Sequence, residues 1–129
     1  MVTEKNEIHS TVEKIKKIGK EKVKFIILYG SVSEEKQTPM SDIDLAVYYD
    51  DTKEKRFRFR MKILGEVNEK FDIQIFQDLP LYVKNEVLKG KVLYCPDHKI
   101  LYDTDRATYQ DFEEFKYRFY DYIKGGVIS

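Results

Sequence analysis

The chain has 129 residues, in which 23 Lys and Arg side chains balance 23 Asp and Glu side chains. Its length and its hydrophobic content of 42% suit one domain with a packed core, which excludes two full domains and a wholly disordered chain. The zero net charge excludes a general attraction to nucleic acid or to an anionic membrane. One cysteine and two histidines exclude an intrachain disulfide and a cluster of zinc ligands.

Two further features concern location. No apolar run approaches the roughly 20 residues that cross a bilayer, and the N-terminus lacks the apolar stretch of a signal sequence. We therefore expect a single domain over residues 1–129, located in the cytoplasm, with neither a membrane nor nucleic acid as its partner.

The first part of the chain predicts a helix followed by two strands. Ile8, Val12 and Ile15 recur at helical spacing, which predicts a helix over residues 3–18 that Gly19 ends. The apolar run at 24–29 is rich in β-branched and aromatic residues and predicts a strand buried on both faces. The next twelve or so residues are polar, with Gly, Ser and Pro, and predict a loop. Residues 42–49 then predict a second strand whose start is exposed and whose end is buried.

Residues 53–70 fit two patterns. Phe57 and Phe59 alternate with arginines as in a strand, yet Phe57, Met61 and Leu64 also fit a helical stripe. We favour a helix because the strand period fails after Ile63. The remaining patterns predict a strand at 71–76, a helix at 80–89, a strand at 92–95, a helix at 106–123 and a frayed tail at 125–129.

Acidic residues stand at the starts of the second and third predicted strands. Asp42 and Asp44 are two positions apart, so their carboxylates share a face and repel unless a cation lies between them. Taken alone, such a pair is more often two solvated aspartates. Asp72 can join the pair if the two strands are neighbours in the sheet. Three converging carboxylates, with no His or Cys nearby, are the ligands that two Mg²⁺ or Mn²⁺ ions require.

Gly30 and Ser31 follow directly after the first buried strand. Glycine lets a backbone approach a ligand closely, and a hydroxyl beside backbone N–H groups can hold phosphate oxygens. As a bare dipeptide the pair indicates only a turn. It gains meaning together with the acidic residues that follow.

These features together resemble a known family. The sequence Leu-Tyr-Gly-Ser at 28–31, followed by Ser-Asp-Ile-Asp-Leu-Ala-Val at 41–47, closely resembles the signature of the polymerase-β-like nucleotidyltransferase superfamily. The small size and the third carboxylate in Phe-Asp-Ile at 71–73 resemble the minimal nucleotidyltransferases (MNT), which are often antitoxin partners of HEPN proteins. The implied fold is α/β (α+β), with a small mixed β-sheet flanked by helices.

The resemblance implies a role for each matched residue. Gly30 and Ser31 would hold the phosphates of a nucleoside triphosphate such as ATP, and Asp42 and Asp44 would bind two ions of Mg²⁺ or Mn²⁺. Asp72 would bind the catalytic ion and help to deprotonate the acceptor hydroxyl. The implied reaction is metal-dependent transfer of AMP from ATP to a hydroxyl, in particular to a tyrosine of a HEPN toxin, which makes the chain an antitoxin.

Two alternatives stay open, and a departure from the family pattern supports the first of them. Many relatives carry Ala-Arg-Gly soon after the Gly-Ser, whereas this chain reads Val-Ser-Glu-Glu-Lys at 32–36. Lys36 is a poorer match to a triphosphate than an arginine fork. The chain could therefore be a non-catalytic antitoxin that sequesters its partner. The other alternative is transfer to a small molecule of the aminoglycoside kind.

Two surface features remain outside this scheme. Residues 53–62 hold six basic residues against one acidic residue, which is either a solvated face or a docking surface. We assign Phe57 and Phe59 to the core. The last predicted helix has an aromatic stripe that we also assign to the core, and it has further tyrosines that could form an interface: Phe112, Phe115, Phe119 and Tyr122 in the stripe, and Tyr109, Tyr117 and Tyr120 outside it.

Overall fold

A computed structural model describes the backbone of residues 2–30 and 43–128, and the side chains of residues 5–30 and 43–118. Its elements follow one another as α1 (Val2–Gly19), η1 (Lys20–Lys22), β1 (Val23–Tyr29), β2 (Ile43–Tyr49), α2 (Lys53–Leu64), β3 (Phe71–Ile75), η2 (Phe76–Asp78), α3 (Leu81–Val87), β4 (Lys91–Tyr94) and α4 (His98–Ile128). Within these ranges no helix is both long and apolar enough to cross a membrane.

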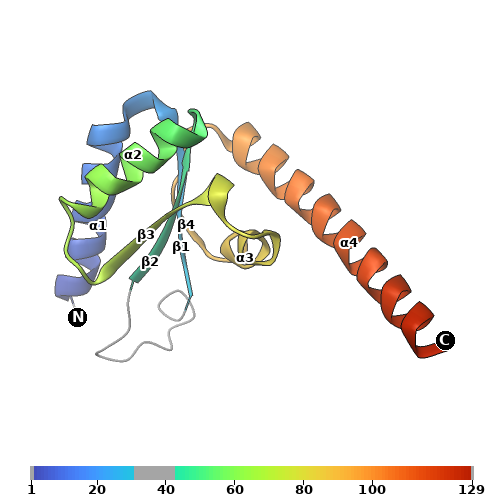
Figure 1. The fold of residues 1–129 in the computed structure, drawn as a ribbon. Helices are drawn as coiled ribbons and strands as arrows, with labels where there is room; N and C mark the ends of the chain where they lie inside the picture. Colours follow the sequence, from blue (N-terminus) through green and yellow to red (C-terminus); the bar gives the residue numbers. More distant parts are fainter. Residues whose placement is uncertain (1, 31–42, 129) are drawn as a thin grey trace.

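The strands form one mixed sheet in the order β3-β2-β1-β4. β1 pairs antiparallel with both β2 and β4, whereas β2 and β3 run parallel and are connected through α2. Figure 1 shows the sheet almost edge-on, with α1 and α2 on one side and α3 on the other. This arrangement confirms the predicted mixed sheet flanked by helices. It also makes the second and third predicted strands neighbours.

The alternating side chains of the strands form a core on each face of the sheet. On the α1 and α2 side, Val12 and Ile15 of α1 and Ile63 of α2 pack against strand residues such as Leu45 and Ile73. On the other side, Phe25, Ile27 and Ala46 pack with Phe76 and Val87, and Leu101 of α4 joins them. Burying an aliphatic or aromatic side chain of this size stabilises the fold by roughly 1.5–3 kcal/mol. The central strand β1 is therefore buried on both faces, as its apolar run predicts.

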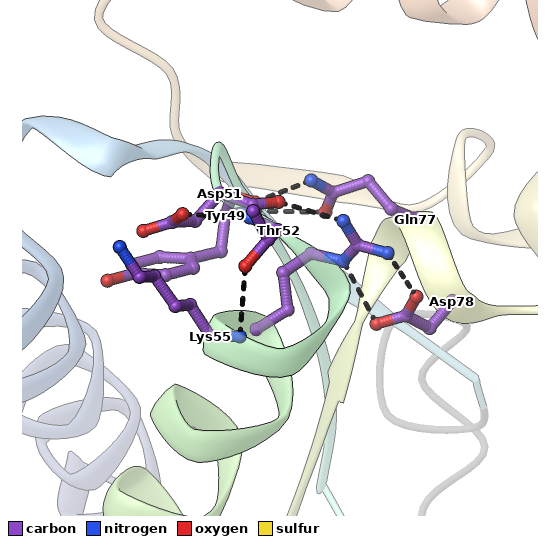
Figure 2. A network of polar contacts seen from close by, with 7 residues as sticks. Tyr49, Asp51, Thr52, Lys55, Gln77 and Asp78 are labelled. Carbon is purple, nitrogen blue, oxygen red and sulfur yellow. Dashed lines mark hydrogen bonds and ion pairs between the residues drawn. The ribbon is translucent and has the colours of Figure 1, made fainter.

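A polar network holds the start of α2 in place (Figure 2). It lies where β2 ends, at the far end of the sheet from the start of β2. Thr52 caps the helix by accepting a hydrogen bond from the backbone N–H of Lys55 at 3.3 Å. Arg56 donates to both carboxylate oxygens of Asp78, at 3.2 and 2.7 Å, and to the carbonyl oxygen of Asp51 at 2.8 Å. These contacts tie α2 to β2 and η2, so the helix that connects the parallel strands has a fixed orientation.

α1 ends at Gly19, as predicted. Gly19 keeps a helical φ of −87°. Lys20 takes the positive φ of 52° instead. A Cβ at Gly19 would collide with the side chains of Val23 and Phe59. The glycine therefore allows close packing between α1 and the sheet.

Two aromatic assignments are corrected. Phe59 is buried, but Phe57 is 58% exposed, because residues two apart on a helix point in nearly opposite directions. The closing helix α4 begins at residue 98, not 106, and continues through the predicted tail to Ile128. Phe115 of its aromatic stripe is 55% exposed, so it is not a core residue in this chain. The side chains of Phe119 and Tyr122 lie outside the described set.

Candidate active site

The parallel strands β2 and β3 start at the same edge of the sheet, and their first acidic residues meet there. Asp44 and Asp72 are register partners, so their backbones lie about 4.8 Å apart on neighbouring strands. Their chain neighbours Ile43, Leu45 and Ile73 face the core under α1 and α2. Because side chains alternate along a strand, both carboxylates lie on the opposite face, on the side of α3. Both side chains are half-buried.

Tyr29 lies next to these two carboxylates. It is the register partner of Asp44 on β1, and its ring packs against the core on the α3 side. Burial, together with the negative charges of Asp44 and then Asp72, raises the pKa of Tyr29 to about 12. The phenol therefore keeps its proton at neutral pH and can donate a hydrogen bond into the acidic site.

Gly30 directly follows β1 and lies against the side chain of Asp44. Its φ is +80°, a left-handed conformation that favours glycine. A Cβ built at this position would lie 2.5 Å from Oδ2 of Asp44. The sequence predicts a glycine that permits close approach, and the structure shows that Asp44 itself is one of the groups that come close.

Gln74 is a member of the site that sequence reasoning missed. It lies two positions after Asp72 on β3, and therefore on the same face. Its Nε2 donates to Oδ1 of Asp72 at 3.0 Å, which fixes the direction of that carboxylate. The available signal in the sequence was that Gln74 is polar and stands two positions after Asp72, in a strand whose other residues are apolar. Tyr29 was missed for another reason, because only the pairing of β1 with β2 brings it beside Asp44.

The described part of the site is suited to a hard divalent cation. Two carboxylates on neighbouring strands, with no His or Cys beside them, form a donor set of the kind that Mg²⁺ and Mn²⁺ prefer. Asp42 and Ser31 lie outside the described residues. Among the residues that are described, no group of three or more His, Cys, Asp and Glu side chains is placed to hold a metal ion. The structure thus brings together Gly30, Asp44 and Asp72 of the five predicted site residues.

Comparison with known families agrees with this geometry. The family described as "Polymerase beta, Nucleotidyltransferase" matches residues 13–99, which span α1 to the start of α4. The chain is also 34% identical over 95 residues to a protein of Methanocaldococcus jannaschii that is named as a protein adenylyltransferase. The match covers 74% of this chain and 68% of that protein. The chain belongs to the polymerase-β nucleotidyltransferase family.

Solved structures with the same fold come from toxin–antitoxin complexes. One, a toxin–antitoxin with AMP-PNP, has a TM-score of 0.70 and 20% identity, and the match covers 93% of this chain and 98% of that chain. Another contains a tri-AMPylated HEPN toxin of Shewanella oneidensis with its MNT antitoxin, at a TM-score of 0.65 and 19% identity, and covers 93% of this chain and 95% of that chain. At these identities the likeness concerns the fold.

Proposed function

We propose that the chain is an adenylyltransferase that transfers AMP from ATP to a tyrosine hydroxyl of a HEPN-type toxin and so acts as its antitoxin. The observation that carries this proposal is the meeting of Asp44 and Asp72 on one face, with Gly30 folded against Asp44. This is where the polymerase-β family pattern requires acidic groups and a glycine.

The proposed roles follow from these positions. Asp44 and Asp72, together with Asp42, hold Mg²⁺ or Mn²⁺, and Gly30 and Ser31 contact the phosphates of ATP. The bound ions supply charge neutralisation at the triphosphate and at the attacking oxygen. Gln74 holds Asp72 in one orientation, and Asp72 accepts the proton of the acceptor hydroxyl.

The proposed reaction exchanges one phosphorus–oxygen bond for another. The acceptor oxygen forms a bond to the α-phosphorus of ATP, and the bond from that phosphorus to the bridging oxygen of the β-phosphate breaks. Pyrophosphate leaves with the electron pair. The chain contributes positioning and charge and forms no covalent bond of its own, as is typical for this type of transfer.

Two comparisons support the choice of acceptor. The relative from Methanocaldococcus jannaschii is named for adenylyl transfer to protein. The toxin–antitoxin structures of the same fold include one with an ATP analogue and one with an AMPylated HEPN toxin. A protein acceptor also suits a small domain, because the acceptor then supplies part of the binding surface itself.

The test is transfer of label from ATP to protein. Purified chain is incubated with ATP labelled in the adenosine or α-phosphate, Mg²⁺ and a HEPN-type protein, and the modified residue is identified by mass spectrometry. We expect label on tyrosine with the wild type and a loss of at least about 100-fold with Asp44→Asn or Asp72→Asn. The matched control is Asp50→Asn, because Asp50 is exposed just after the other end of β2. Transfer by both site variants at the wild-type rate would contradict the proposal.

The same experiment separates the alternatives. The absence of an arginine at 32–36 favours a non-catalytic antitoxin. That function would be shown by toxin inhibition that Asp44→Asn leaves intact while no label moves. Label found on a small hydroxylated molecule and not on protein would assign the chain to small-molecule transfer.

A further inference from the structure

A groove lies along the outer edge of β3, beside the candidate active site. It has a volume of about 200 Å³ and is lined by Lys53, Phe57, Arg60, Gln74, Ile75 and Asp78. The first three residues belong to α2, which lies along the sheet next to β3 (Figure 1). The others belong to β3 and η2. The groove is therefore bounded by an edge strand on one side and by a basic helix on the other.

The wall formed by α2 includes an exposed aromatic ring. Phe57 is 58% exposed, although it is a large apolar residue in a helix made mostly of charged residues. Met61, one turn later, is 41% exposed and extends the apolar surface along the helix. Because exposed apolar side chains that adjoin a groove are typical of binding surfaces, this pair favours contact with another molecule.

The charge of the groove is positive. Lys53 and Arg60 have no ion-pair partner among the residues that the structure describes. The one acid in the lining, Asp78, is already bound to Arg56 at 2.7 Å. Figure 2 shows the Asp78 carboxylate directed toward this contact. An occupant of matching charge would therefore be acidic.

The edge of β3 is closed to strand addition. Nε of Arg60 donates to the carbonyl oxygen of Ile73 at 2.7 Å and so occupies the hydrogen-bonding edge in the middle of the strand. A partner chain pairing with this edge would have to displace Arg60. The groove is thus suited to side chains, and a strand-like peptide backbone is a poor match.

The groove is connected to the candidate catalytic carboxylate through one residue. Gln74 lines the groove and also donates to Asp72 at 3.0 Å. Ile75, farther along, stands three positions from Asp72, about 10 Å along the strand. A group seated in the groove is therefore close enough to orient a hydroxyl presented to Asp72.

We propose that the groove at the β3 edge is the docking subsite for the acceptor protein, which inserts an apolar side chain against Phe57 and sets an acidic residue beside Lys53 and Arg60. This inference rests on the proposed adenylyl transfer and adds the surface that selects the acceptor. It also explains why the apolar side chain of Phe57 is exposed on a lysine- and arginine-rich helix.

The experiment measures KM and kcat for a HEPN-type acceptor protein with Lys53→Glu and Phe57→Ser. We expect each change to raise the acceptor KM by about tenfold, because a few residues carry most of the affinity of an interface. The values of kcat and of KM for ATP should stay at wild-type values, since neither side chain touches the nucleotide site. Raising the salt concentration should increase the wild-type KM and affect Lys53→Glu less.

Two control variants match these changes. Lys55→Glu makes the same charge change two residues away, where the side chain lines a different groove on the opposite side of α2. It should leave the acceptor KM unchanged. Phe57→Leu keeps an apolar side chain and should retain most of the affinity. Melting temperatures of all four variants verify that the exposed substitutions leave the fold intact.

The outcomes separate this inference from the proposed function. If the wild type modifies the acceptor and both Lys53→Glu and Phe57→Ser keep its KM, the docking subsite is wrong while the activity stands. If the wild type modifies no protein, the proposed function fails and the docking subsite fails with it. A single-stranded RNA could instead compete with the acceptor protein and lose its own binding in Lys53→Glu. That result would overturn the inference and assign the groove to nucleic acid.

Discussion

Gly30 is the position in the candidate site where a single methyl group should have the largest effect. Gly30→Ala places a Cβ only 2.5 Å from Oδ2 of Asp44, which is too close for an undisturbed contact. The backbone at this position also has a φ of +80°. The left-handed backbone alone costs about 1–2 kcal/mol for a residue with a Cβ. We expect a lower free energy of unfolding by denaturant and, because Asp44 must move, weaker binding of ATP with Mg²⁺ by calorimetry.

Gly65→Ala is the matched control for this change. Gly65 ends α2 with a φ of −76°, and the nearest atom to a Cβ added there is a carbonyl oxygen 3.5 Å away. Alanine adopts this conformation without strain and should stabilise the chain by about 0.4–1 kcal/mol. Equal effects of the two substitutions would show that the Gly30 backbone is not constrained by Asp44.

The paired carboxylates predict an unusual combination of effects for Asp72→Asn. Asp44 and Asp72 lie side by side and repel when no cation is present, so removing one charge should leave stability unchanged or slightly higher. The same change should abolish Mg²⁺-dependent nucleotide binding. Melting in EDTA and titration calorimetry measure the two effects. A large fall in melting temperature would instead identify Asp72 as a structural acceptor for Gln74.

At this scale the sequence predicted the acidic groups but not their surroundings. Gly30, Asp44 and Asp72 stand out because their residue types are unusual at the ends of apolar strands. Tyr29 and Gln74 do not, since a tyrosine or a glutamine in a strand has no distinctive local signal. Their places in the site depend on strand register, which forms only when distant segments pair.

At the scale of elements, the link between η1 and the start of α2 predicts a pH dependence. Lys22 donates to Asp51 at 2.5 Å, and this hydrogen bond lowers the pKa of Asp51 and raises that of Lys22. A lowered carboxylate pKa contributes stability above the ordinary value near 4, and this stability is lost as the pH falls through the lowered value. Melting temperature measured from pH 7 down to pH 2 should therefore fall less steeply for Asp51→Asn than for the wild type. Parallel curves would show that the ion pair does not contribute.

The helices show why pattern reading succeeds for some elements and fails for others. α1 was predicted because aliphatic residues recur at helical spacing along its inner face, as in Val12 and Ile15. The start of α4, at residues 98–105, was missed because Thr104, which is half-buried there, is polar. A polar residue on the inner face hides the helical period. Asp97, whose Oδ1 accepts from the backbone N–H of Lys99 at 3.0 Å, was the available start signal.

For the whole molecule, the notable feature is the length and direction of α4. Its 31 residues correspond to about 46 Å of helix. Leu101 and Thr108 face the domain, whereas Phe115, one heptad later on the same face, is 55% exposed. In Figure 1 the distal half of α4 points away from the sheet and the other helices. The inward face of the helix therefore continues past the domain that covers its first half.

This geometry leads to the prediction that the chain functions in complex with a second protein that packs on the distal half of α4. Phe115→Ala combined with Tyr117→Ala, at residues that are 55% and 75% exposed, should weaken association with a HEPN-type protein by at least about tenfold. Nucleotide binding should persist, because Asp44 and Asp72 lie on other elements. Tyr82→Ala on α3, at 66% exposure, is the control. Sedimentation velocity of the mixed proteins measures the effect. If the α4 double variant binds the HEPN-type protein as tightly as the wild type does, α4 is not the contact.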